Sequence, residues 1–221
     1  ILLLLFSVTL FAQAERRFEK DILKETFGFS ESTKATVPLK DLHQGCPARD
    51  CIPSIDNPGF IPAKEATRFK EDEPVMVVDY NGIQRAYSLL IMQYHEIVND
   101  DFNGKPLAVT YCPLCASAVA FIPEVKGKFT TFGVSGVLHN SDLVMYDRET
   151  ESLWGQITGT AIVGSQTGNK LERVYVSQHK WGKAKALFPD LQALLPPENS
   201  EGNYSKDCLL YTSPSPRDSD Q

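Results

Sequence analysis

Two β-rich stretches flank a Cys-Pro-Leu-Cys sequence at residues 112–115, and this arrangement constrains the fold more than any other feature. Leu107–Tyr111 is apolar and β-branched, which predicts a strand, and Val119–Ile122 predicts the next one. Pro113 lacks an N–H and has a fixed φ, so the first strand should end there. Cys112 and Cys115 are therefore expected in a tight turn, where two thiols can converge on a soft metal ion or form a reducible disulfide.

Both ends of the chain are expected to lie outside the folded domain. Residues 1–14 contain an uncharged apolar run followed by Ala-Gln-Ala, which indicates the apolar region and cleavage site of a truncated signal peptide. The run is shorter than the ~20 apolar residues that a membrane span needs, so we expect no transmembrane segment in the mature chain. Residues 208–221 resemble a translated sequencing adapter and are interpreted as non-native.

Residues 15–207 have a length that suits a single globular domain. The whole chain has a formal net charge of −6, which argues against a nucleic-acid partner because such proteins need a concentrated basic face. The sequence identifies no other partner. A signal peptide predicts export to the periplasm or the extracellular space, where disulfides are stable.

Turn and helix signals predict the fold class. Asn81-Gly82 lies between two apolar runs and predicts a β-hairpin, because both central residues of such a turn need a positive φ. Ser88 should cap a helix over residues 89–98, and Ser177 should cap a final helix that ends near Pro189. The prediction is an α+β single domain, with a largely antiparallel, curled β-sheet and two main helices.

The thiol pair needs further ligands if it is to hold a metal. His95 lies four residues after Ile91 and three before Val98, so its ring should share the inward face of the predicted helix. His139 is a further candidate ligand from a later loop. Two thiolates and an imidazole suit zinc or copper, and the alternative for His95 is a buried ring hydrogen-bonded to the backbone.

Cys46 and Cys51 lie in a loop rich in proline and glycine. We predict a local disulfide between them, which would stabilise the domain by roughly 2 kcal/mol in the chain-entropy model. The alternative is that these thiols join a metal site.

Several other residues are candidates for a cleft. Glu96 could orient the neighbouring imidazole or act as a base. Ser135 has glycine two residues before and one after it, which does not match the spacing of a hydrolase nucleophile elbow. Trp154 could line a cleft or fill the core. The full set of cleft candidates is Glu96, Tyr111, Ser135, Asn140, Asp147, Arg148 and Trp154.

Several blocks of the sequence resemble, in the same order, the family catalogued as domain of unknown function 3179. The resemblance covers about residues 42–195. The blocks are His-Glu-Ile-Val-Asn-Asp at 95–100, Val-Thr-Tyr-Cys-Pro-Leu-Cys at 109–115, Phe-Gly-Val-Ser-Gly at 132–136, Leu-Val-Met-Tyr-Asp-Arg at 143–148, and Glu-Ser-Leu-Trp at 151–154.

This family is typically prokaryotic, often carries export signals and has no assigned activity. The resemblance implies that His95, Cys112 and Cys115 belong to a shared constellation. His139 stands where the family usually has a tyrosine, which weakens its case as a ligand. The resemblance also implies that Cys46 and Cys51 serve a local disulfide.

Three functional hypotheses follow from the sequence. The first is an exported domain that binds copper or zinc through Cys112, Cys115 and His95. The second is a thiol-dependent redox enzyme or nucleophile that uses the same cysteines, with His95 lowering a thiol pKa. The third is a non-catalytic interaction domain in which both cysteine pairs are structural disulfides.

Overall fold

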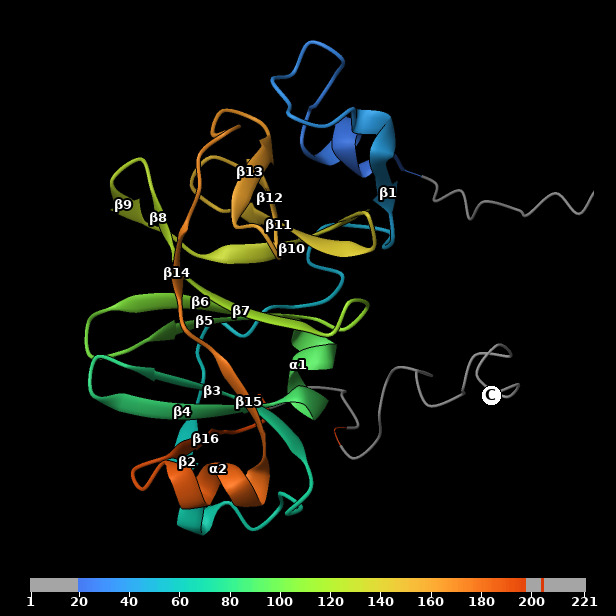
Figure 1. The fold of residues 1–221 in the computed structure, drawn as a ribbon. Helices are drawn as coiled ribbons and strands as arrows, with labels where there is room; N and C mark the ends of the chain where they lie inside the picture. Colours follow the sequence, from blue (N-terminus) through green and yellow to red (C-terminus); the bar gives the residue numbers. More distant parts are fainter. Residues whose placement is uncertain (1–19, 198–203, 205–221) are drawn as a thin grey trace, which may run out of the picture.

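The computed structural model describes residues 20–197 and residue 204. The expected signal peptide and the expected adapter-derived tail lie outside the described residues. The described chain builds three β-sheets, which follow one another from top to bottom in Figure 1 and are called the upper, middle and lower sheets. Every strand pairing within these sheets is antiparallel except that between β16 and β4.

The upper sheet has the order β1 (Leu42–Gln44), β10 (Phe132–His139), β11 (Asp142–Asp147), β12 (Leu153–Gly155), β13 (Thr160–Val163). The middle sheet has the order β14 (Glu172–Val174), β7 (Ser117–Ile122), β6 (Pro106–Cys112), β5 (Ile97–Asp101). The lower sheet has the order β15 (Ser177–Lys180), β3 (Pro74–Tyr80), β4 (Ile83–Ser88), β16 (Gln192–Leu194), β2 (Phe60–Pro62). A small ribbon pairs β8 (Glu124–Val125) with β9 (Lys128–Phe129).

Few helices accompany the sheets. The α-helices in the described part of the chain are α1 (Leu89–His95), between the lower and middle sheets, and α2 (Trp181–Leu187), which covers the lower sheet from below in Figure 1. Short turns of other helix types occur at η1 (Ile22–Thr26), η2 (Leu39–Asp41) and η3 (Ala63–Glu65). Within residues 20–197 and 204, no helix is long and apolar enough to cross a membrane.

Side-chain alternation along the strands divides the core into separate clusters. In β3, Met76 and Val78 pack toward the middle sheet, whereas Val75 and Val77 pack against α2. In β6, Val109 and Tyr111 share the core with the lower sheet. Alternate residues of β6, Ala108 and Cys112, share the core with Phe132, Leu143 and Trp154 of the upper sheet. The strand that carries the first thiol is therefore buried on both faces.

The predicted hairpin at Asn81-Gly82 is confirmed. Both residues have a positive φ, +48° and +77°, and they join β3 to β4. The prediction of mostly antiparallel sheet with few helices is also confirmed, but the expectation of one curled sheet is wrong. The strands separate into three sheets because both faces of β3 and β6 are apolar and each strand contributes to two cores.

Two predicted helix boundaries are wrong. The first helix ends at His95 rather than at residue 98, because Glu96 adopts a φ of +59° and the following β-branched residues pair with β6 as strand β5. The final helix begins after Lys180, and Ser177 belongs to β15, which pairs with β3. The Ser88 cap of the first helix is confirmed, because its hydroxyl accepts from the Leu90 N–H at 3.1 Å, whereas cross-strand pairing overrides the capping signal at Ser177.

Candidate metal centre

The Cys-Pro-Leu-Cys sequence forms the hairpin loop between β6 and β7. Cys112 pairs with Ser117 at the end of the ladder, and four residues close the loop. Ala116 has a φ of +51°, which turns the chain into β7. The Cys112 side chain is buried and that of Cys115 is exposed, and both are free thiols. The predicted strand, turn and strand are confirmed.

Asp142, which belongs to the upper sheet, lies beside the two thiols. It begins β11 after a tight turn in which Asn140 and Ser141 both have positive φ. The two sulfurs and a carboxylate oxygen of Asp142 all lie within 4.8 Å of one another. The Cys115 sulfur lies 3.7 Å from Asp142 Oδ1, and the Cys112 sulfur lies 3.8 Å from the Ser141 carbonyl oxygen. Two hairpins that are distant in sequence thus meet at one point.

A polar network holds the thiol turn in place. The Ser117 hydroxyl lies 3.1 Å from the Cys115 sulfur and donates a 2.7 Å hydrogen bond to Gln156 Oε1. The buried Gln156 amide donates in turn to Thr110 Oγ1 at 2.9 Å. On the other side, the Ile157 backbone N–H donates to Asp142 Oδ2 at 3.0 Å. Outer contacts of this kind orient ligand atoms before a metal arrives.

Burial favours the protonated forms of Cys112 and Asp142. Burial, together with the hydrogen bond to Cys115, raises the pKa of the Cys112 thiol to about 12. Burial also raises the pKa of Asp142, although the backbone N–H of Ile157 acts in the opposite direction. A metal ion bound between these side chains would therefore displace protons from them.

The two sulfurs and the carboxylate oxygen form a donor set that could hold a metal ion. Tetrahedral Zn–S bonds of ~2.3 Å would place two sulfurs about 3.8 Å apart, so atoms within 4.8 Å need only a small adjustment. Three protein ligands leave the fourth position for water or another ligand, as in catalytic zinc sites. A carboxylate oxygen is a harder ligand than the imidazole expected from the sequence.

The structure does not place His95 in this group. Its Nδ1 lies 2.8 Å from the Pro53 carbonyl oxygen and its Nε2 lies 2.6 Å from the Tyr204 hydroxyl, so both ring nitrogens have partners. Tyr204 belongs to the core shared with the lower sheet, whereas Cys112 belongs to the core shared with the upper sheet. Burial lowers the pKa of His95, which favours the neutral ring.

The sequence profile of a family described as "Protein of unknown function (DUF3179)" matches residues 49–217. The chain belongs to this family. A search of curated proteins and a search of solved structures each gave no match. The thiol turn, Asp142 and Gln156 all fall within the matched range.

In this DUF3179 domain, His139 neighbours Asp142 but is not one of the three possible ligands Cys112, Cys115 and Asp142. It pairs with Asp142 across the β10–β11 hairpin, and its charged form would lower the pKa of that carboxyl. Its ring Nε2 lies 3.5 Å from the Asn140 side-chain amide. Asn140 itself is an exposed residue of the hairpin turn.

The remaining cleft candidates occupy separate places in the DUF3179 domain. Asp147 is fully buried and accepts hydrogen bonds from the Trp154 indole N–H at 2.8 Å and from the Thr150 backbone, so it fixes the turn after β11. Trp154 fills the core. The Ser135 hydroxyl donates to the Val144 carbonyl at 2.5 Å beside the irregularity in β10.

Three further candidates remain. The segment 45–59 between β1 and β2 is called the early loop. Arg148 bonds Asp56 at 3.0 Å and so attaches the early loop to the upper sheet. Tyr111 is buried in the core between the middle and lower sheets. Glu96 lines a separate apolar cavity that the thiol turn also borders.

The predicted disulfide between Cys46 and Cys51 is present, with a Cα–Cα distance of 6.3 Å. It closes part of the loop that leads to β2. Because these two sulfurs are bonded to each other, they are not ligands of the candidate metal centre at Cys112, Cys115 and Asp142. The four cysteines within residues 20–197 therefore form one bonded pair and one free pair.

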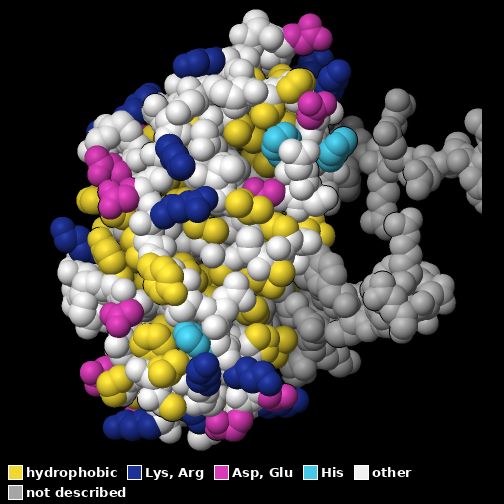
Figure 2. Space-filling model, in the orientation of Figure 1, with side chains coloured by type: hydrophobic (Ala, Val, Ile, Leu, Met, Phe, Trp, Pro, Cys, Tyr) yellow, Lys and Arg dark blue, Asp and Glu magenta, His cyan; other side chains and the backbone are white. Residues whose placement is uncertain are grey.

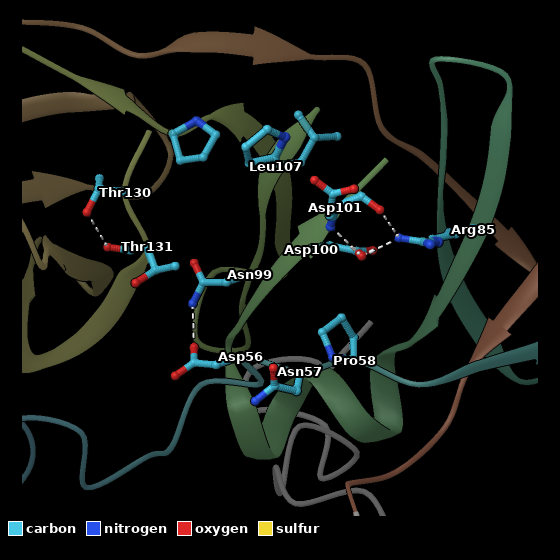
Figure 3. Close-up of a pocket in the computed structure, with 12 residues that line it drawn as sticks. Asp56, Asn57, Pro58, Arg85, Asn99, Asp100, Asp101, Leu107, Thr130 and Thr131 are labelled. Carbon is cyan, nitrogen blue, oxygen red and sulfur yellow. Dashed lines mark hydrogen bonds and ion pairs between the residues drawn. The ribbon is translucent and has the colours of Figure 1, made fainter. Parts of the chain in front are cut away.

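A polar pocket of about 470 Å³ lies elsewhere, between the early loop and the outer end of β5 (Figure 3). Its charged groups already have partners. Arg85 bonds Asp100 and donates to the Asp101 carbonyl at 2.8 Å, and Asn99 donates to Asp56 at 2.7 Å. Arg85 also lies 4.1 Å above the Phe60 ring. This pocket is held together by internal ion pairs.

Figure 2 shows one face of the molecule, in the orientation of Figure 1. Basic and acidic side chains are interspersed over its coloured part rather than gathered by sign. This distribution gives the face no extended basic surface of the kind that binds nucleic acid.

Asp142 is the possible ligand that the sequence analysis did not identify. Asp142 had one usable signal, because Asn140-Ser141 between two apolar runs suits a two-residue hairpin turn and places Asp142 at a strand start. This local pattern does not predict that the turn lies against the loop that carries Cys112 and Cys115.

Proposed function

We propose that this DUF3179 domain binds a zinc ion through Cys112, Cys115 and Asp142. The observation that carries the proposal is the convergence of two free sulfurs and a carboxylate oxygen within 4.8 Å of one another. The mixed sulfur and oxygen donors favour zinc over copper(I), which prefers ligand sets of sulfur and nitrogen. The fourth position would be open to a water molecule or a substrate atom.

The experiment is metal analysis of the reduced protein after zinc loading and gel filtration. We expect about one zinc per chain in the wild-type protein and a loss of most of it in Cys112→Ser. His95→Gln is the matched control, because it separates this ligand set from the one expected from the sequence. Retained zinc in His95→Gln supports the Cys112, Cys115 and Asp142 set.

Two results would contradict the proposal. Equal, substoichiometric metal in the wild-type protein and in Cys112→Ser would exclude a thiol-based site. Loss of zinc in His95→Gln, with circular dichroism unchanged, would return the imidazole to the ligand set.

A thiol redox enzyme is the second candidate. The observation that favours it is that an exposed free thiol, Cys115, lies three residues from a buried free thiol, Cys112. Burial raises the pKa of Cys112 to about 12, so Cys115 would be the attacking thiol. Alkylation rates measured against pH test this candidate, and a Cys115 thiol that titrates near the free-cysteine value of ~8.5 would count against it.

We also propose that the protein is exported from the cytoplasm. The Cys46–Cys51 disulfide suits an oxidising compartment outside the cytoplasm. Fractionation of cells that express the full-length precursor would test export, and recovery of the protein only in the cytoplasmic fraction would exclude it.

A further inference from the structure

An apolar cavity of about 230 Å³ lies beside the thiol turn. Four parts of the chain form its wall, one of which is the end of α1. Pro113 and Leu114 contribute from the loop between the two cysteines, Leu143 and Leu138 contribute from the upper sheet, and Cys46 contributes from the disulfide loop. Hydrocarbon therefore covers most of the wall.

Glu96 is the acidic residue of this wall, and its side chain has no partner. It is only 7% exposed, and no hydrogen bond or ion pair to its carboxyl group is found among residues 20–197 and 204. Burial alone raises its pKa to about 7. A largely buried carboxylate without a protein partner is costly, so an occupant that pairs with it offsets part of that cost.

The backbone at Glu96 is also held in an unusual conformation. Its φ is +59°, which a non-glycine residue adopts at a cost. The strain is maintained from both sides, because the Glu96 N–H donates to the Met92 carbonyl at 2.6 Å and its carbonyl accepts from the Tyr111 N–H at 2.8 Å. This conformation fixes the point at which the side chain leaves the end of α1, beside the cavity.

We propose that this cavity binds a small apolar amine, whose ammonium group pairs with the Glu96 carboxylate and whose hydrocarbon body packs against the leucines and Pro113. A carboxylate is an acceptor only, so the complementary group must be a donor, and a cation pairs with it best. A cavity of ~150 Å³ suffices for benzene, so about 230 Å³ accommodates an aromatic ring with a short aminoalkyl chain.

This inference does not depend on a metal at the thiols. Glu96 is not among the three possible metal ligands, and none of the three lines the cavity. If both proposals hold, the turn that carries the thiols separates a zinc ion from an amine site. An experiment on the amine can therefore succeed or fail independently of one on zinc.

The probe is 2-phenylethylamine, with 2-phenylethanol as the neutral control of nearly the same shape. We expect the amine to bind the protein at least about tenfold more tightly than the alcohol at pH 8, because only the ammonium group can pair with the charged Glu96 carboxylate. In Glu96→Gln, the two affinities should become equal. Glu65→Gln, on an exposed short helix, is the matched control and should behave as wild type.

Amide chemical shifts locate the binding. We expect the largest changes at Leu114, Gly136 and Leu143, which line the cavity. Repeating the titration with Cys112→Ser separates this result from the zinc proposal, because loss of metal should leave amine binding unchanged. Equal affinity for amine and alcohol, undiminished amine binding in Glu96→Gln, or no saturation up to about 10 mM amine would each overturn the inference.

Discussion

The Cys115 sulfur lies 3.7 Å from Asp142 Oδ1, although the two residues are 27 positions apart in the sequence. One stands in the loop after β6 and the other at the start of β11, so the contact joins the middle sheet to the upper sheet. The proposed zinc site is thus placed where two sheets meet.

Asp142→Asn tests the oxygen ligand. An amide is neutral and binds zinc weakly, so we expect zinc affinity to fall by at least about tenfold, since loss of even an outer-contact residue typically costs 10- to 100-fold. Competition with a chromophoric chelator measures the affinity. Asp72→Asn, an exposed aspartate away from the site, is the control and should leave it unchanged. Equal affinity in both variants would remove Asp142 from the ligand set.

Zinc binding should release protons. The Cys112 pKa of about 12 means that this thiol is protonated at neutral pH, and it must lose its proton to ligate. The apparent affinity should therefore rise with pH, by up to about tenfold per pH unit for each proton released. Calorimetry in two buffers with different ionisation enthalpies counts the protons. Binding that is independent of both pH and buffer would contradict a thiolate site.

Glu96 should lower the stability of the domain as the pH rises. Its pKa is about 7 in the folded protein, against an ordinary value of 4.5. Between these two pH values, the folded state therefore holds a proton that the unfolded state has lost. Stability is then fully present below pH 4.5 and declines until the pH passes 7. The total loss is roughly 3 kcal/mol.

Glu96→Gln should remove this pH dependence. Urea unfolding of both proteins at about pH 4 and about pH 8 measures it, and the variant should gain roughly 3 kcal/mol relative to wild type over this range. Parallel pH profiles of the two proteins would show that Glu96 ionises as freely in the fold as in the unfolded chain.

The Tyr87–Asp100 pair should contribute to stability rather than to binding. The buried Tyr87 hydroxyl donates to Asp100 Oδ2 at 2.5 Å, and Arg85 bonds the other oxygen. Tyr87→Phe should cost about 1.5–3 kcal/mol in chemical unfolding, the usual contribution of a hydrogen bond to a charged group. Tyr175→Phe is the control, because that side chain is 82% exposed. Equal stabilities of the two variants would show that Asp100 does not need this donor.

The sequence by itself determined the local features of this protein. The Asn81-Gly82 hairpin, the thiol turn between β6 and β7, and the Cys46–Cys51 disulfide each depend on residues that are close together in the chain, so their types and spacing were sufficient. Local signals were less reliable for the end of α1, where the pairing of β5 with β6 decided the boundary.

Only the tertiary structure decided which groups share a site. His95 and Cys112 come from adjoining elements, yet the ring contacts the core shared with the lower sheet and the sulfur faces the upper sheet. Because side chains alternate across a strand, the face that each residue presents depends on sheet pairing, which residue spacing alone does not encode. The same packing brought Asp142 to the thiols in place of the imidazole and left Glu96 unpartnered beside an apolar cavity.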